Sequence, residues 1–130
     1  MNLSIYSTIM AESILKTKSY EFSIKVVHLY QHLSQEKKEF ILSKQLVRSW
    51  TSIWAMIREA EFWQSKADFI HKMNIALKEA NETLYWLDIL QDTWYINQTQ
   101  HQNIYPLGHE ILKILISSMK TLKDKQQKKI

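Results

Sequence analysis

The sequence contains no cysteine, one glycine and one proline among its 130 residues. The absence of cysteine excludes disulfides, thiol nucleophiles and thiolate metal sites, and it suits a reducing compartment. A β-sandwich or barrel of this length needs several turn-forming residues, so the scarcity of glycine and proline argues against an all-β fold. The same scarcity excludes a function that depends on a glycine-rich phosphate-binding loop.

The chain is instead rich in apolar and aromatic side chains. Apolar residues make up 45% of it and charged residues 23%, and it has five Trp, six Tyr and four Phe. This composition provides enough material for a buried core, and the length suits one domain. We therefore expect a single folded domain.

The net charge of +4 lies almost entirely at the C-terminal end. Five lysines occur from Lys120 to Lys129 against the single acidic residue Asp124, so positions 1–119 are balanced. Such lysine runs more often solubilise a chain end than bind nucleic acid. The N-terminal segment has no basic residue before Lys16, no long apolar run and no small-residue cleavage pattern. We expect a cytoplasmic protein with no membrane partner.

Helical periodicity runs along nearly the whole chain and predicts an all-α fold. The predicted helices span residues 10–33, 35–62, 66–93 and 99–123. Apolar residues recur at helical spacing at Tyr20, Ile24, Val27 and Tyr30; at Phe40, Val47, Trp50, Ile53, Trp54 and Ile57; at Phe69, Met73, Ala76, Leu77, Ala80, Leu84 and Leu87; and at Ile104, Leu107, Ile111, Leu115 and Leu122. Pro106 and Gly108 predict a kink or an irregular first turn in the fourth helix.

Two polar segments contain helix-start signals. Ser34 is the predicted cap of the second helix, with Glu36 in its first turn. Ser65 and Asp68 have capping-box spacing and predict the start of the third helix. Four helices joined by short links pack most simply as an antiparallel up-down four-helix bundle. We assign residues 1–123 to this bundle and residues 124–130 to a basic Lys/Gln tail.

The second helix is apolar on more than one side. Val47 and Trp54 lie on a different side from the stripe that contains Trp50. A monomeric bundle needs only one apolar face, so the extra surface predicts oligomer contacts through Val47, Trp50 and Trp54. A wide stripe covered within the same chain explains the pattern equally well.

Candidate sites for metal or catalysis are weak. Asp68 and His71 have the spacing of the carboxylate–histidine element of di-iron bundles, but a second pair is missing and Asp68 is explained as a capping residue. His28 and His32 are four residues apart without an evident third ligand. No motif presents a nucleophile. We expect no metal, no cofactor and no enzymatic activity.

Four basic residues are candidates for nucleic-acid binding, because aromatic residues lie between them in the sequence: Lys44, Arg48, Arg58 and Lys66. Aromatic residues at helical spacing more often belong to a core. Arg48 and Arg58, the only arginines, are about 80° apart around a helix, so they share a broad surface and not a single stripe.

A long stretch of the chain resembles a known family. Residues 44–60, beginning Lys44-Gln-Leu-Val-Arg, and residues 64–87, beginning Gln64-Ser-Lys-Ala-Asp, resemble the bacterial four-helix bundle protein family, also named for intervening sequences in 23S ribosomal RNA genes. The similarity begins near Lys18 and continues to Lys120. The resemblance implies an up-down bundle that commonly forms a ring-like homopentamer. The family includes the accessory variability protein of diversity-generating retroelements, which associates with a reverse transcriptase and nucleic acid.

The chain departs from the family pattern at its tryptophans. Where relatives typically read Arg-Ser-Gly-Thr-Ser-Ile-Gly-Ala-Asn, this chain has Trp50, Trp54 and Met56. Trp63 and Trp94 also stand where relatives often carry a small residue. Three explanations stay open: UGA codons that specify glycine and are translated here as tryptophan, deliberate redesign, and a natural lineage with a repacked core.

The predicted function is that of a non-catalytic, homo-oligomeric assembly or adaptor module, with RNA or an RNA-linked partner, such as a reverse transcriptase-like protein, as candidate partners. The alternative is an RNA- or DNA-binding module that uses Lys44, Arg48, Arg58 and Lys66. A second alternative is an enzyme of unknown reaction.

Overall fold

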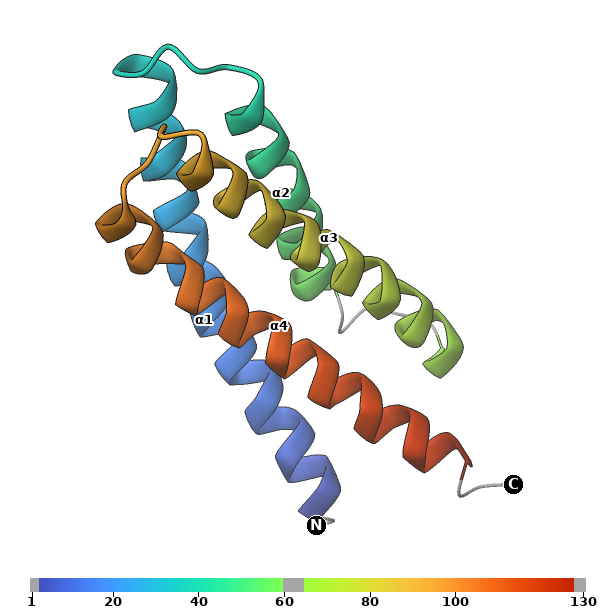
Figure 1. The fold of residues 1–130 in the computed structure, drawn as a ribbon. Coiled ribbons are helices and arrows are strands. Elements are labelled where there is room, and N and C mark those ends of the chain that lie inside the picture. The colour runs from blue at the N-terminus through green and yellow to red at the C-terminus, as the bar shows by residue number, and fades with distance from the viewer. Residues whose placement is uncertain (1–2, 60–64, 128–130) are drawn as a thin grey trace.

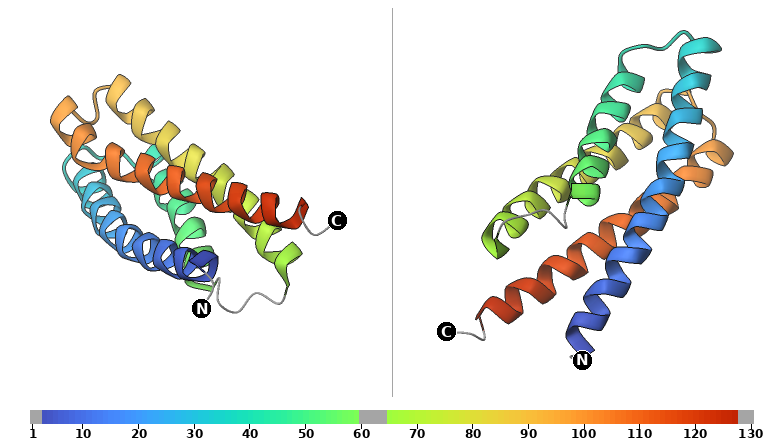
Figure 2. Two further views of the ribbon diagram at one scale, coloured as in Figure 1. Left: turned by 90° about the horizontal axis from the view of Figure 1, so that it is seen from below. Right: turned by 180° about the vertical axis from the view of Figure 1, so that it is seen from behind.

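A computed structural model describes residues 3–59 and 65–127, with side chains for residues 14–59 and 65–121. It consists of four helices, α1 (Leu3–Gln35), α2 (Leu42–Glu59), α3 (Lys66–Asp92) and α4 (Gln98–Gln127), and these described residues contain no strand (Figure 1). Each helix packs mainly on two others, since α1 and α3 both contact α2 and α4. Two further views show how the four helices lie relative to one another (Figure 2). The predicted all-α, four-helix fold is confirmed.

The core is built from one stripe of each helix. Its fully covered side chains include Phe22, Leu33, Leu46, Ile53, Leu87, Leu90, Ile111 and Leu115. The stripes predicted for α3 and α4 are buried at Met73, Ala76, Ala80, Leu84, Leu87, Ile104, Leu107, Ile111 and Leu115. Leu122 lies outside the described side chains, and Trp63 lies outside the described residues. No described helix is long and apolar enough to cross a membrane.

The stripe predicted for the first helix is wrong. Tyr20, Ile24 and Val27 are exposed, and Tyr30 is half-buried. The residues that α1 buries are Leu15, Phe22, Val26, Leu29 and Leu33. Both sets recur every three or four residues, so periodicity alone does not decide which one faces the other helices. The side of α1 opposite the core is therefore also apolar.

The connection between α1 and α2 differs from its prediction. Ser34 belongs to α1, where its hydroxyl donates to the Tyr30 carbonyl oxygen at 2.8 Å. Glu36 follows the end of α1 and does not lie in the first turn of α2. The actual cap is Glu39, whose carboxylate accepts hydrogen bonds from the backbone N–H groups of Ile41, Leu42 and Ser43 at 2.8, 2.7 and 2.8 Å. Glutamate is not among the preferred capping residues, so Ser34 gave the stronger capping signal in the sequence.

The start of α3 follows the sequence signal. The Ser65 hydroxyl oxygen accepts a hydrogen bond from the Asp68 N–H at 3.1 Å, and Asp68 lies in the first turn, where a negative charge is favourable. The predicted cap at Ser65 is confirmed, and Asp68 takes part in it through its backbone N–H.

The end of α3 has a Schellman arrangement. Trp94 N–H bonds to the Gln91 carbonyl oxygen at 3.0 Å, and Tyr95 N–H bonds to the Leu90 carbonyl oxygen at 3.0 Å. This arrangement places Trp94 in the left-handed region, with φ 66°. Glycine is the usual residue there, because a Cβ atom is unfavourable in that conformation.

The fourth helix contains both Pro106 and Gly108. Because α4 begins at Gln98, Pro106 lies in its interior and not in an irregular first turn. Gly108 is buried, and a Cβ atom there would lie 2.8 Å from Phe22 Cε2 and 2.9 Å from Leu84 Cδ2. The only glycine of the chain therefore permits α4 to approach α1 and α3 closely.

Candidate functional site

An apolar surface lies on the outer side of α1, together with one neighbouring side chain of α2. We call Tyr20, Ile24, Val27 and Trp54 the outer strip. The three α1 residues are 62%, 43% and 51% exposed. The Tyr20 and Trp54 rings are 6.4 Å apart between centroids, so the strip extends from α1 onto α2. A helix that is apolar on opposite sides usually buries both of them, and contiguous exposed apolar surface commonly marks a protein contact.

The residues of α2 predicted as oligomer contacts occupy different environments. Trp50 is buried within its own chain, with its ring 4.4 Å from that of Phe22 and its Nε1–H donating to Ser23 Oγ at 2.7 Å. Val47 and Trp54 are half-buried at the edge of the core. The described surface therefore offers Val47 and Trp54 for an intermolecular contact, while Trp50 packs inside.

The four predicted nucleic-acid-binding residues do not form one patch. Arg48 Nη2 pairs with Glu82 of α3 at 2.7 Å, so its charge is already compensated. The Arg58 guanidinium lies 5.9 Å from the centroid of the Trp54 ring, on the side of α2 nearer α1. Lys44 is at the start of α2 and Lys66 at the start of α3, toward opposite ends of the bundle (Figure 1). Lys44 and Arg58 are exposed, and neither has an ion-pair partner among the described residues.

The histidines and carboxylates form pairs and no larger group. His32 Nδ1 lies 2.8 Å from Glu36 Oε2, and His101 Nε2 lies 2.9 Å from Asp88 Oδ1. Within residues 3–59 and 65–127, no three His, Cys, Asp or Glu side chains are placed to hold a metal ion. His28 is exposed and has no ion-pair partner among the described residues.

Two groups in the described chain have shifted pKa values. Burial acts to raise the pKa of Glu39, but hydrogen bonds from the amides of residues 41–43 and from Ser43 outweigh it and lower the pKa below 4.5. Burial, and secondarily the negative charge of Asp88, raises the pKa of Tyr105 above 10.0. Glu39 is a structural cap. Tyr105 is stacked on His101 with centroids 4.6 Å apart, so its shift follows from packing.

The outer strip was not predicted as a surface. Its α1 residues form the predicted apolar stripe of the first helix, and α1 carries a second apolar series at helical spacing, which is the buried one. Counting both series would have identified one of them as unpartnered within the chain.

Comparison with known proteins identifies one family model and one solved structure to which this chain is similar. Residues 11–117 match the family model of the 23S rRNA-intervening sequence protein. A crystal structure of a protein of unknown function from the S23 ribosomal protein family of Bacteroides thetaiotaomicron is 55% identical. The match covers 85% of this chain and 98% of that one, with a TM-score of 0.81. No curated protein matches the chain.

Proposed function

Because the chain belongs to the 23S rRNA-intervening sequence protein family, we propose that it acts as a non-catalytic assembly module that associates with copies of itself. In this proposal the helices form an antiparallel up-down bundle, and several bundles assemble into a ring, most simply the homopentamer that the family resemblance implies. The candidate outside partner is RNA or an RNA-linked protein such as a reverse transcriptase-like enzyme.

The observation that carries the proposal is the outer strip. Its α1 residues are as regularly spaced as the core residues of the same helix, yet they are exposed in the single chain. Exposed aromatic and branched aliphatic side chains in one patch lower the free energy of a complex when a second surface covers them. The half-buried ring of Trp54 extends the patch onto α2 and gives it an aromatic anchor of the kind that dominates protein interfaces.

A charge placed inside the strip tests the proposal. Val27→Glu introduces a carboxylate that would have to be desolvated on assembly, whereas the matched control Asn74→Glu adds the same charge at an exposed position of α3. We expect the unmodified chain and the control to sediment as multimers at micromolar concentration and Val27→Glu to sediment as a smaller species. Circular dichroism on all three chains checks that the helices are retained.

Two results would contradict the assembly proposal. One is a stable monomer at micromolar concentration, in sedimentation and light scattering, both for the unmodified chain and for a chain with glycine at positions 50, 54, 63 and 94. The other is a Val27→Glu chain that is folded and has the same mass as the unmodified multimer, since the strip would then lie outside the contacts.

The alternative function is nucleic-acid binding, and the exposed Lys44 and Arg58 support it. Arg58 lies beside the Trp54 ring, and such a cation–aromatic pair is common on surfaces that bind single strands. If this alternative holds, affinity for single-stranded RNA falls steeply with salt, and Lys44→Gln or Arg58→Gln each lowers the salt slope by about 1. The balanced charge of residues 1–119 leads us to prefer the assembly role.

A further inference from the structure

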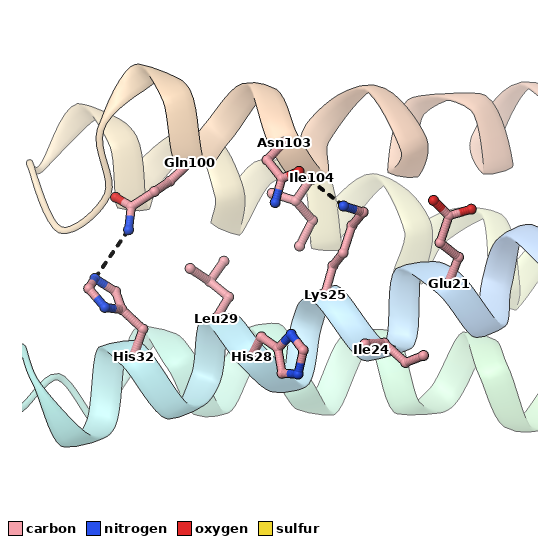
Figure 3. A pocket seen from close by; sticks show the side chains of 9 residues that line it. All are labelled: Glu21, Ile24, Lys25, His28, Leu29, His32, Gln100, Asn103 and Ile104. Atoms are coloured by element: carbon pink, nitrogen blue, oxygen red, sulfur yellow. Dashed lines mark hydrogen bonds between the residues drawn. The ribbon is translucent and has the colours of Figure 1, made fainter.

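A slot with polar and apolar lining lies between α1 and α4 (Figure 3). Its volume is about 430 Å³, within the range of pockets that hold small organic ligands. Six residues of α1, among them Lys25, Leu29 and His32, and three residues of α4, Gln100, Asn103 and Ile104, line it. Two helices far apart in the sequence therefore form it, and α1 supplies most of the lining.

Two hydrogen bonds cross the slot and divide it. Lys25 Nζ donates to Asn103 Oδ1 at 3.0 Å, and Gln100 Nε2 and His32 Nε2 are 3.2 Å apart. Lys25 and His32 are two helical turns apart on α1, which corresponds to about 10 Å. Figure 3 shows the Leu29 side chain between these two crossings, on the side of the slot opposite Gln100 and Asn103.

The floor of the slot is apolar. Leu29 is 8% exposed and Ile104 is 2% exposed, so both belong to the core and only their edges line the slot. Because core packing holds both residues, the floor does not need to rearrange to receive a ligand. Apolar floors with a few convergent polar groups are typical of sites for small molecules.

Lys25 supplies a positive charge at one end of the slot. Within the described side chains Lys25 has no ion-pair partner, whereas Lys18, two turns earlier on α1, is paired with Glu110 at 3.1 Å. An ammonium group has three donors, and Asn103 Oδ1 occupies one of those of Lys25. Glu21 also lines the slot, one turn before Lys25 and outside the segment between the two crossings.

We propose that this slot binds a small organic anion. Its carboxylate or phosphate monoester group accepts hydrogen bonds from Lys25 Nζ and, after displacement of the crossing bond, from the Asn103 amide. Its flat apolar body lies on Leu29 and Ile104, and a polar far edge reaches Gln100 and His32. The proposed ligand contacts lie on the α4 side of α1, and Ile24 is the one residue that lines the slot and also belongs to the outer strip.

The proposal is tested by calorimetric titration of the full chain with phenyl phosphate, benzoate, inorganic phosphate and the neutral analogue benzyl alcohol. We expect one of the two aromatic anions to bind more tightly than inorganic phosphate, which identifies the anionic group, and benzyl alcohol to show no binding. Lys25→Met should weaken the preferred aromatic anion at least tenfold, since hydrogen bonds to charged groups contribute strongly. The matched control Lys16→Met removes the same charge from an exposed position of the same helix and should change affinity less than twofold.

A second comparison of ligands tests the proposed contact with Gln100 and His32 at the far edge of the slot. An aromatic anion with a hydroxyl group opposite the anionic group should bind more tightly than its unsubstituted parent, and Gln100→Ala should remove this difference. Equal losses of anion affinity in Lys25→Met and Lys16→Met would overturn the proposal, because they would indicate a general effect of charge. Benzyl alcohol or inorganic phosphate binding as tightly as the preferred aromatic anion, or no binding of any probe, would overturn it too. Unfolding temperatures of the variants check that the fold is unchanged.

Discussion

Replacing Trp94 by glycine should stabilise the protein. Trp94 has φ 66°, and a residue with a Cβ atom in this region costs about 1–2 kcal/mol relative to glycine. Its side chain is 88% exposed, so its removal gives up little burial. Glycine gains about 0.4–1 kcal/mol of additional freedom in the unfolded chain, which offsets part of the benefit. We expect Trp94→Gly to raise the free energy of unfolding by about 0.5–1 kcal/mol.

Denaturant unfolding monitored by helix content measures this change, and it should appear as a higher midpoint with an unchanged slope. For a chain of this length the midpoint of thermal unfolding should rise by about 2–5 °C. Trp94→Ala is the matched control, because it removes the indole and keeps the Cβ atom at the same φ. If Trp94→Ala stabilises as much as Trp94→Gly, the exposed indole and not the backbone is the cause. A less stable Trp94→Gly chain would refute the argument.

Two further predictions concern the single glycine and the cap of α2. Gly108→Ala should destabilise the fold by about 1–3 kcal/mol in denaturant unfolding, because the added methyl would overlap the buried Phe22 ring; unchanged stability would show that the ring can move. Glu39→Gln should cost about 1 kcal/mol near neutral pH, because the charged cap becomes neutral. The pKa of Glu39 is lowered in the folded state, so its contribution is complete above pH 4.5 and is lost as the pH falls through the lower folded value. The stability difference between the two chains should therefore shrink on acidification below pH 4.5, and a constant difference would contradict this role.

The fold was largely predictable because the helix signals are strong and repeated. α3 was predicted to within a residue at both ends, since Ser65 is a preferred cap and its apolar residues form one stripe. The start of α2 was not predicted correctly, because the cap of α2 is Glu39. The capping role of Glu39 depends on a turn that brings its carboxylate back to three backbone amides. No periodic pattern encodes that turn.

The surfaces were less predictable than the fold. In α1 two apolar series compete, and only the positions of α2 and α4 decide that Phe22 faces inward and Val27 outward. The slot depends on Lys25 and Asn103, which are far apart in the sequence and meet across two helices. Sequence spacing carries no information on such a pair, whereas the capping pair of Ser65 and Asp68 is local and could be recognised directly.

The tryptophans that the family resemblance places at small-residue positions differ in how well the fold accepts them. Trp94 has a positive φ, which favours glycine. Trp50 instead lies in the regular α2 helix, and its Nε1–H donates a hydrogen bond to Ser23 Oγ. Gly108 shows what a glycine does in this bundle, since it lets a neighbouring helix approach closely. Glycine at positions 50 and 54 would permit the same approach between α1 and α2 and would reshape the outer strip.

One explanation of the tryptophans is that UGA codons specifying glycine are translated here as tryptophan. This hypothesis predicts UGA at the codons of residues 50, 54, 63 and 94, and UGG at all four would exclude it. It also predicts a difference in assembly, because the outer strip would then have evolved beside glycine at positions 50 and 54. A chain with glycine at 50, 54, 63 and 94 should form the ring-like multimer in sedimentation, while the chain with tryptophan should assemble less completely. If both chains are stable monomers at micromolar concentration, the assembly proposal is wrong whichever residue the codons specify. If both form the same multimer, the tryptophans are compatible with the contacts, and the close approach of α1 and α2 is not needed for assembly.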